Sequence, residues 1–383
     1  MKLHKGSLIF LSLAFGAHAL GQVSFTPLGD LPGGFYGSAA FGVSSDGMTA
    51  VGRSYSANAP SGYWEAFRWQ NGVMTGLGDL PGGDFDSWSN AASANGSVVV
   101  GQGVSSSGPE AFRWQGGTMT GLGDLPGGTF QSVAYDVSAN GSVVVGSSDS
   151  TSNVSWDREA FRWENGVMTG LGDLPGGSFR SDATGVSANG LVVVGEGWSA
   201  SGIEAFRWEN GVMTGLGDLP GGGFFSHASA VSADGLTVVG YGTTASGPEA
   251  FRWQGGVMTG LGYLQGSFFG SSATAVSADG SVVVGNSYNT PFLWTAGSGM
   301  LDIQQMLVSQ GLGTQLTGWT LYTASGVTVV NGQAFVTGHG RNPSGTYEAY
   351  LAVLDPVPEP ATLLAAGSGF AALILRRRGG RRP

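Results

Sequence analysis

The acidic side chains outside the repeated motifs are the residues of this 383-residue chain whose types best suit catalysis. Two carboxylates about 5–10 Å apart can act as acid and base, or as acid and nucleophile, in the cleavage of a glycosidic bond. Asp84 and Asp86 lie beside Trp88 and form the first pair to consider, although solvated loop charges are the simpler interpretation. The other candidates are Asp136, Asp149, Asp157, Asp182 and Glu196.

Other catalytic chemistry lacks the residues that it needs. The chain has no cysteine, and only His227 and His339 follow residue 21. It contains no His-Glu-x-x-His pattern and no phosphate-binding loop, so neither a zinc site nor a histidine-based triad is predicted. We therefore predict no catalytic residue, no metal site and no cofactor. We expect a non-enzymatic protein, with a glycoside hydrolase that uses loop carboxylates as the alternative.

The elements that position these residues come from a repeat. The motif Gly-Leu-Gly-Asp-Leu-Pro-Gly-Gly occurs at 76–83, 121–128, 170–177 and 215–222, and a near copy occurs at 27–34. The leucine before its Gly-Asp recurs in steps of 49, 45, 49, 45, 45 and 40 residues. Such periods are typical of propeller blades or arrays rather than of β-solenoid coils.

Each unit contains two signals for tight hairpins, because Asn-Gly, Asp-Gly and Gly-Gly pairs tolerate the positive φ of a type I′ turn. In the first hairpin the glycine follows Asp46, Asn95, Asn140, Asn189, Asp234, Asp279 or Asn331. In the second hairpin it follows Asn71, Gly116, Asn165, Asn210 or Gly255. Two hairpins make four antiparallel strands per unit.

The second strand of each unit, Val-Val-Val or a variant, is apolar on both faces and must be covered on both sides by neighbouring sheets. We therefore predict an all-β fold, a seven-bladed β-propeller of four-stranded repeats over residues 22–356. The last unit lacks a fourth strand, so Val23–Leu31 is expected to pair with Glu348–Leu354 and close the ring. The tryptophans of the third strands are expected in the core between blades: Trp69, Trp114, Trp163, Trp208, Trp253 and Trp294.

The aspartate of the motif and the arginine of the following third strand recur together. Where Tyr263 replaces the aspartate, Leu293 replaces the next arginine. We therefore predict ion pairs between consecutive blades, in preference to repeated Ca²⁺ sites, which need more oxygen ligands and no adjacent guanidinium. The predicted pairs are Asp30 with Arg68, Asp79 with Arg113, Asp124 with Arg162, Asp173 with Arg207 and Asp218 with Arg252.

Both ends of the chain are typical of targeting segments. Residues 1–21 combine Lys2 and Lys5 with the apolar Leu8–Phe15, which predicts a helical signal peptide. Residues 357–383 contain an apolar stretch, 361–375, followed by five arginines. We expect this stretch to form a transmembrane helix of roughly 22 Å, which is marginal for a ~30 Å hydrocarbon core, with the arginines on the cytoplasmic side.

The C-terminal segment resembles the PEP-CTERM sorting tail of Gram-negative bacteria. The resemblance rests on Val357, Pro358, Glu359 and Pro360, a short apolar helix, and Arg376, Arg377 and Arg378. It implies processing near the Pro-Glu-Pro by an exosortase, which is a membrane transpeptidase, and a link to cells that produce exopolysaccharide.

The units also resemble HAF-type extracellular repeats, over roughly residues 27–350. Five units here have Glu-Ala-Phe where those repeats have His-Ala-Phe. This resemblance implies the repeat architecture and an extracellular setting, but no common activity.

Charge narrows the choice of partners. Residues 22–358 contain nine arginines, no lysine and 25 acidic residues, a formal charge of −16, so no nucleic-acid partner is expected. We expect an exported protein of the cell surface or extracellular matrix, associated with exopolysaccharide or another envelope component. An adhesion scaffold for a protein ligand is a further alternative.

Overall fold

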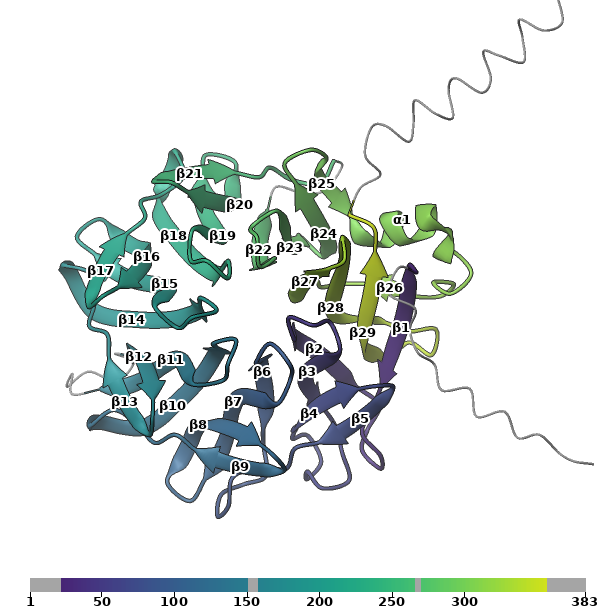
Figure 1. Cartoon of the computed structure of the whole chain (residues 1–383), viewed down its shortest axis with the longest axis horizontal. Coiled ribbons are helices and arrows are strands. Elements are labelled where there is room, and N and C mark those ends of the chain that lie inside the picture. The colour runs from purple at the N-terminus through teal and green to yellow at the C-terminus, as the bar shows by residue number, and fades with distance from the viewer. Residues whose placement is uncertain (1–21, 151–157, 266–269, 357–383) are drawn as a thin grey trace, which may run out of the picture.

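The computed structural model describes residues 22–150, 158–265 and 270–356. These residues form antiparallel sheets arranged around a central axis, so the fold is all-β and propeller-like (Figure 1). The predicted signal peptide at 1–21 and the tail at 357–383 lie outside the described residues.

Most of the sheets contain four consecutive strands, and the first strand of each lies nearest the axis (Figure 1). The two sets β14–β17 and β18–β21 are joined by one parallel pair, Ile203 with Phe225. The strands of the first three sheets are β2 (Ser38–Val43), β3 (Thr49–Ser54), β4 (Glu65–Gln70), β5 (Val73–Gly76), β6 (Trp88–Ala92), β7 (Val98–Ser105), β8 (Gly108–Gln115), β9 (Thr118–Gly121), β10 (Gly127–Val137), β11 (Val143–Ser150), β12 (Arg158–Glu164) and β13 (Val167–Gly170). Those that follow are β14 (Gly176–Val186), β15 (Val192–Ser199), β16 (Gly202–Glu209), β17 (Val212–Gly215), β18 (Gly221–Val231), β19 (Thr237–Thr244), β20 (Gly247–Gln254), β21 (Val257–Gly260), β22 (Ser271–Val276), β23 (Val282–Ser287), β24 (Thr290–Thr295) and β25 (Gly299–Asp302).

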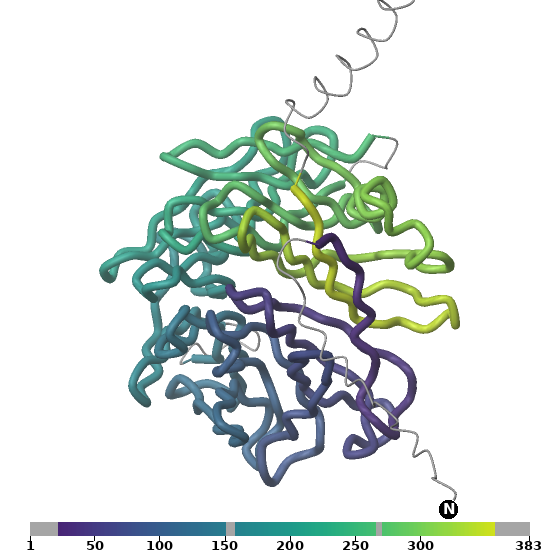
Figure 2. The backbone as a smooth tube through the Cα atoms, turned by 45° about the vertical axis from the view of Figure 1, so that its right-hand side comes forward, coloured from purple at the N-terminus to yellow at the C-terminus, as the bar shows by residue number. Residues whose placement is uncertain are grey.

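The remaining sheet joins the two ends of the described chain. It contains β26 (Thr320–Leu321), β27 (Gly326–Val330), β28 (Gln333–Arg341), β29 (Tyr347–Leu354) and β1 (Ser24–Gly29). Strand β1 pairs antiparallel with β29, from Ser24 opposite Val353 to Gly29 opposite Ala349, and the two strands run side by side in Figure 2. The predicted pairing of Val23–Leu31 with Glu348–Leu354 is confirmed.

Separate hydrophobic clusters fill the spaces between neighbouring sheets. The valines of the second strands are fully covered, as Val98, Val99 and Val100 show with at most 1% exposure, and this confirms the expectation from their apolar sequence. Phe161 is fully buried in a cluster with valines of the preceding sheet. The predicted tryptophans pack against these clusters: Trp69 is buried, and the others are partly buried.

The two kinds of hairpin use different turns. In the five predicted outer hairpins both turn residues have positive φ, for example Asn71 (52°) and Gly72 (81°), which confirms the predicted type I′ geometry. The inner hairpins, apart from Asn331-Gly332, are not such turns, because only the glycine has positive φ. Their Asp or Asn side chain accepts a hydrogen bond from the backbone two residues later, as Asp46 does from Met48 at 2.9 Å, and this bond stabilises a longer loop.

One segment departs from the repeat altogether. Helix α1 (Ile303–Leu307) continues into η1 (Val308–Leu312), and the Asp302 side chain caps α1 by accepting a hydrogen bond from Gln305 N. Leu307 and Trp319 help to fill the core beside the β26–β29 sheet. None of the helices in residues 22–150, 158–265 and 270–356 is long and apolar enough to cross a membrane. The predicted transmembrane helix, 361–375, falls outside these ranges.

Candidate functional site

The two ends of the sheets differ in what joins the strands. The hairpins that join first to second strands and third to fourth strands lie at one end, which we call the hairpin face. The segments that join second to third strands and one sheet to the next lie at the other end, which we call the connection face. Examples are residues 55–64 and 77–87. The second-to-third segments are two residues long after β7, β15, β19 and β23, and longer elsewhere.

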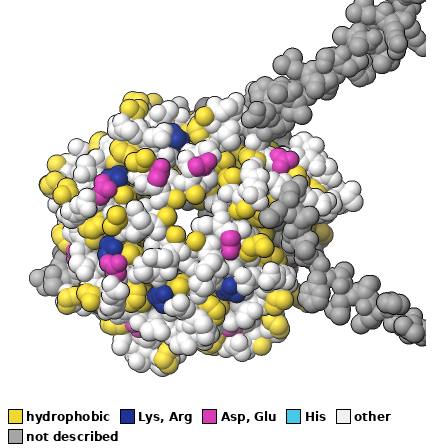
Figure 3. All heavy atoms as spheres, in the orientation of Figure 1, with side chains coloured by type: hydrophobic (Ala, Val, Ile, Leu, Met, Phe, Trp, Pro, Cys, Tyr) yellow, Lys and Arg dark blue, Asp and Glu magenta, His cyan; other side chains and the backbone are white. Residues whose placement is uncertain are grey.

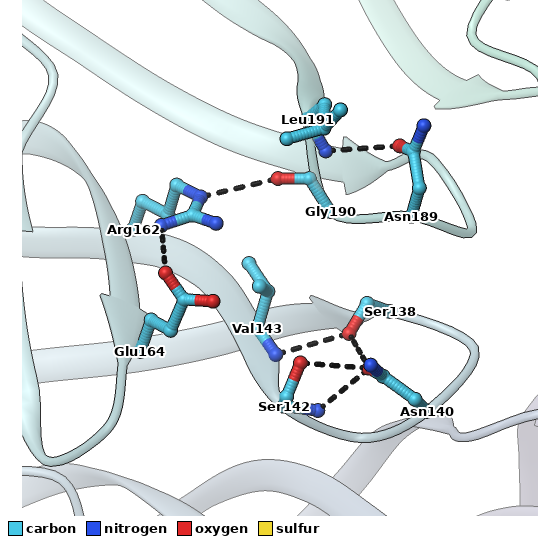
Figure 4. A network of polar contacts seen from close by, with 9 residues as sticks. All are labelled: Ser138, Asn140, Ser142, Val143, Arg162, Glu164, Asn189, Gly190 and Leu191. Atoms are coloured by element: carbon cyan, nitrogen blue, oxygen red, sulfur yellow. Dashed lines mark hydrogen bonds and ion pairs between the residues drawn. The ribbon is translucent and has the colours of Figure 1, made fainter.

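The repeated arginines belong to the hairpin face. Arg162 Nε donates a hydrogen bond to the carbonyl oxygen of Gly190, in the inner hairpin of the next sheet, at 3.1 Å, and its Nη1 lies 2.9 Å from Glu164 Oε2 (Figure 4). The same arginine-to-glycine contact, at 2.8–3.2 Å, is made by Arg68, Arg113, Arg207 and Arg252.

The prediction of aspartate–arginine pairs is therefore wrong. The ion pairs within the described ranges are Arg162–Glu164, Arg180–Asp182, Arg207–Glu209 and His227–Glu196. The aspartates of the motif lie at the opposite, connection face, where they accept backbone hydrogen bonds inside their own connections. Asp30 bonds to Gly37 N, Asp79 to Asp86 N, Asp173 to Arg180 N and Asp218 to Phe225 N, while Asp124 accepts from the Ser148 hydroxyl. Asp and Arg recur together because both belong to the repeat, not because they touch.

Constant serine and glutamate side chains hold the connections in place. Ser181 Oγ accepts from Ala160 N of the preceding sheet at 3.0 Å and donates to Gly172 O at 2.6 Å. Glu159 Oε1 accepts from Gly172 N at 3.0 Å. Equivalent bonds recur in the other sheets. We call these constant serine and glutamate contacts the base of the connection face, because they fix where its loops begin.

Positions just above this base vary from sheet to sheet. They are the residue that follows the constant serine (Ser181 and its counterparts) and the cross-strand partner of that residue on the second strand, which share one face of the sheet. The pairs are Ala39–Arg53, Trp88–Gln102, Val133–Ser147, Asp182–Glu196, His227–Tyr241 and Ser272–Asn286. Because the surrounding repeat is nearly constant, this variation is not required by the fold, and it marks the connection face as the candidate site.

A pocket opens on this face between the β22–β25 and β26–β29 sheets. We call it the tyrosine pocket; it measures about 570 Å³ and is lined chiefly by Asn286, Tyr288, Asn289, Tyr322, His339 and Tyr347. The Tyr347 ring lies 5.8 Å from that of Tyr322 and 5.9 Å from that of His339, between centroids. Burial, followed by the charge of Arg53, lowers the pKa of His339. The lining is thus aromatic and polar, and it contains no carboxylate.

An aromatic column lies on the neighbouring β2–β5 sheet. The rings of Tyr55 and Trp64 are stacked, with centroids 3.8 Å apart, and the Arg53 guanidinium lies 4.4 Å from the Trp64 centroid and 5.5 Å from that of Phe41. Phe35, which is 62% exposed, meets Tyr55 edge-on.

The carboxylate candidates do not form one cluster. Asp182 and Glu196 are cross-strand partners, and Glu196 Oε2 lies 2.9 Å from His227 Nδ1. Burial acts to raise the pKa of Glu196, but the hydrogen bond and charge of His227, together with the charge of Arg180, outweigh it and hold that pKa below its usual range.

The other carboxylate candidates lie apart from this pair. Asp86 binds Trp64 N at 2.9 Å in the β2–β5 region, which separates it from Asp182 and Glu196. Asp84 belongs to the same connection, Asp149 lies on β11, and Asp157 lies outside the described residues.

Asp136 occupies a different place, in the wall of the central channel. Cavities of about 210 and 150 Å³ lie along the axis and share Asp136 in their lining, and the ring is hollowed at its centre in Figure 3. Its carboxylate accepts hydrogen bonds from Val137 N and Val186 N, both at 2.8 Å. Burial outweighs these bonds and raises the pKa of Asp136 to about 6. Glycine or alanine fills this position in the other inner strands: Gly42, Ala91, Gly185, Ala230, Ala275 and Gly326.

Two groups of predicted sites remain. Within the described ranges, no three histidine or acidic side chains converge as potential metal ligands. The sorting residues Val357, Pro358, Glu359, Pro360, Arg376, Arg377 and Arg378 fall outside those ranges.

The sequence of the tail has a clear counterpart. Residues 356–378 match the family described as the PEP-CTERM protein-sorting motif. This match confirms the predicted sorting tail and indicates an exported protein that an exosortase sorts. No curated protein matches the chain. The resemblance to HAF-type repeats stays a prediction.

The described fold is similar to solved β-propeller and related structures. The β-propeller domain of the Trilobed protease from Pyrococcus furiosus has 9% identity and a TM-score of 0.49, over 84% of this chain and 96% of that one. TolB from Acinetobacter baumannii has 11% identity and a TM-score of 0.43, over 85% and 67%. The WD40 β-propeller domain of Doa1 has 13% identity and a TM-score of 0.43, over 88% and 98%. Likenesses this distant carry no information on activity.

Proposed function

We propose that this chain is an exported, non-enzymatic protein that binds an exopolysaccharide or a related envelope glycan through its connection face. The observation that carries the proposal is the tyrosine pocket, whose volume of about 570 Å³ is in the range of small-molecule sites. Its tyrosine rings can lie against the apolar face of a sugar, while the amides of Asn286 and Asn289 can bond sugar hydroxyls.

The architecture that supports this proposal is a seven-bladed propeller over residues 22–356. The closing sheet repeats the contacts of the others: Ala349 N donates to Ser38 Oγ at 3.0 Å, and Gly29 N donates to Glu348 Oε1 at 3.1 Å. Because β1 and β29 complete the ring, the signal peptide and tail are not needed for closure. Before exosortase processing, the 361–375 segment holds the chain in the membrane.

The test uses purified residues 22–356 and the matrix polysaccharide of the host cell. We expect the protein to co-sediment with the polysaccharide and to release no new reducing ends. Tyr347→Ala should weaken binding roughly tenfold, because it removes a ring contact of about 1 kcal/mol or more. The matched control is Val167→Ala, which changes a side chain that is 62% exposed on an outer strand. Equal binding by the two variants would contradict the proposed site.

A glycoside hydrolase is the second candidate, and the cross-strand pair Asp182–Glu196 favours it. Carboxyl groups on directly opposite residues are close enough for the retaining geometry of about 5 Å. The ion pair of Glu196 with His227 argues against a free catalytic acid at that position. Release of reducing ends by the wild type, lost in Asp182→Asn, would replace the binding proposal with this one.

A further inference from the structure

Arg53, on β3, lies against two aromatic rings. Its guanidinium carbon lies 4.4 Å from the ring centroid of Trp64 and 5.5 Å from that of Phe41. Tyr55 stacks on Trp64 and fixes the position of that ring. A guanidinium held in this way keeps its orientation, and the N–H groups of its two terminal nitrogens remain for a ligand that approaches along the guanidinium plane.

The guanidinium has no partner in the part of the chain that the structure describes. No residue there accepts a hydrogen bond from it, it joins none of the ion pairs, and its Nε is buried without a bond. Burial lowers the pKa of Arg53, yet an arginine stays charged at neutral pH. The charge of Asp86 partly offsets this effect of burial, but within the described residues no carboxylate forms an ion pair or a hydrogen bond with the cation.

The equivalent residues of other sheets show that this state is not imposed by the repeat. Gln102 donates to Ser132 O at 2.8 Å, and Asn286 accepts from Ala324 N at 3.2 Å. Glu196 pairs with His227. Each of these side chains reaches the next sheet and binds there, whereas Arg53 lies over two aromatic rings and makes no hydrogen bond within the described residues.

The surroundings of Arg53 offer apolar contacts. Phe35, Tyr36 and Tyr63 are 62%, 80% and 41% exposed on the same sheet and its connections. The charge of Arg53 also acts on His339, which places it close to the tyrosine pocket. An extended ligand could therefore contact both features.

We infer that Arg53 is an anion-binding residue of the connection face, and that it binds the carboxylate of a uronic-acid unit in an acidic polysaccharide. A planar carboxylate matches the donors of a guanidinium, and the exposed rings suit the sugar that carries it. Residues 22–358 have a formal charge of −16, so the net field of the protein does not attract a polyanion. Recognition must come from direct contact at Arg53. This inference rests on the proposed function, which it narrows to acidic glycans.

The experiment titrates residues 22–356 with a glucuronate-containing oligosaccharide and with its neutral glucose counterpart, by calorimetry. We expect the wild type to prefer the acidic sugar about tenfold, the effect of one charge-assisted contact. Arg53→Gln should remove this preference and leave the affinity for the neutral sugar unchanged, and Arg53→Lys should keep part of it. Arg180→Gln, on the same face at a side chain that is 38% exposed, is the control and should keep the full preference.

A melting curve separates binding from a structural role. Because the Nε of Arg53 is buried without a hydrogen bond, Arg53→Gln should melt at or above the wild-type temperature; a lower temperature with the preference unchanged would overturn the inference. Equal binding of both sugars by the wild type would overturn it while leaving glycan binding intact, and binding of neither sugar would overturn both proposals. Equal binding of a glutamate oligomer of matched charge would replace the sugar with an acidic protein ligand.

Discussion

The hairpin face and the connection face are built from the same repeat, but they use it differently. On the hairpin face the same contacts return in sheet after sheet: Arg113, Arg162 and Arg207 each donate to a glycine carbonyl at 3.1–3.2 Å. Backbone bonds of 3.0–3.1 Å also link successive inner hairpins, from Ala94 to Ala139 and from Ala139 to Ala188. On the connection face, the side chains above the common base differ in every sheet.

The constant contacts of the hairpin face stabilise the fold, whereas the varied side chains of the connection face distinguish one sheet from another. A contact that recurs in successive sheets explains why the residue that makes it recurs. The hydrogen bond to Gly190 O explains the presence of Arg162 in this way. A residue such as Arg53 or Tyr347 has no counterpart of the same type at its position in other sheets, so the fold alone does not account for it. Stability variants should therefore map to the constant contacts, and binding variants to the varied positions.

The largest expected effect lies in the constant core. Phe161→Ala should lower the free energy of unfolding by about 3–5 kcal/mol, because it leaves a cavity at a fully buried ring. Phe35→Ala, at a ring that is 62% exposed, should change stability by less than about 0.5 kcal/mol but weaken glycan binding. Urea denaturation and co-sedimentation measure the two quantities. A large loss of stability in Phe35→Ala would break the comparison.

Asp136 lies between the two faces, and its effect should depend on pH. Its pKa of about 6 exceeds the ordinary value of 3.8, so the folded state holds the proton more tightly than the unfolded state does. The stability of the wild type should therefore fall as the pH rises from about 4 to 6. Relative to wild type, Asp136→Ala should gain about 2 kcal/mol between pH 4 and pH 7, a figure reduced because the carboxylate faces the channel.

Melting curves at several pH values measure this effect of Asp136. Alanine is the matched replacement, since Ala91 and Ala230 fill the same position in other sheets. If the melting temperatures of variant and wild type changed in parallel with pH, the buried position would not destabilise the charged form of Asp136.

The smallest effect concerns the hairpin contacts. Arg162→Met should cost about 1 kcal/mol, because Gly190 O and Glu164 lose their partner. Asp124→Leu should add to this loss independently, within about 0.5 kcal/mol, since the two side chains lie at opposite ends of their sheets. Arg180→Met, on the connection face, should cost less than Arg162→Met. If the loss of stability in the double variant were much smaller than the sum of the two single losses, an ion pair between Arg162 and Asp124 would be indicated and the structure contradicted.

Most of the fold can be predicted from the sequence because the repeat marks its strands and turns. Strand order, the outer turns at Asn71-Gly72 and its counterparts, and the pairing of β1 with β29 follow from local turn chemistry and from the count of strands. The helix at Ile303–Leu307 was missed because it replaces repeat residues with a short segment that has little periodicity. The inner turns were mistaken because Asn-Gly is compatible with several turns, and the side-chain bond of Asp46 to Met48 N selects a longer one.

The site was harder to predict than the fold. Co-occurrence of Asp124 and Arg162 in the sequence does not indicate contact, because any two constant positions of a repeat co-occur. The tyrosine pocket combines Tyr288 with Tyr347, which lie 59 positions apart, in the two most degraded units. A comparison of equivalent positions within the chain could have found Arg53 and the variable pairs, because that signal needs no distances.

The two ends of the described chain lie at the same face of the molecule. Strand β29 ends at the hairpin face, where Asp355 accepts a hydrogen bond from Gln333 at 3.0 Å and Pro356 borders a cavity with Arg252 and Asp279. Strand β1 begins at the same end, with Ser24 opposite Val353. The described chain therefore begins and ends at the hairpin face. Both termini leave the varied side chains of the opposite, connection face uncovered by the strands that lead to them.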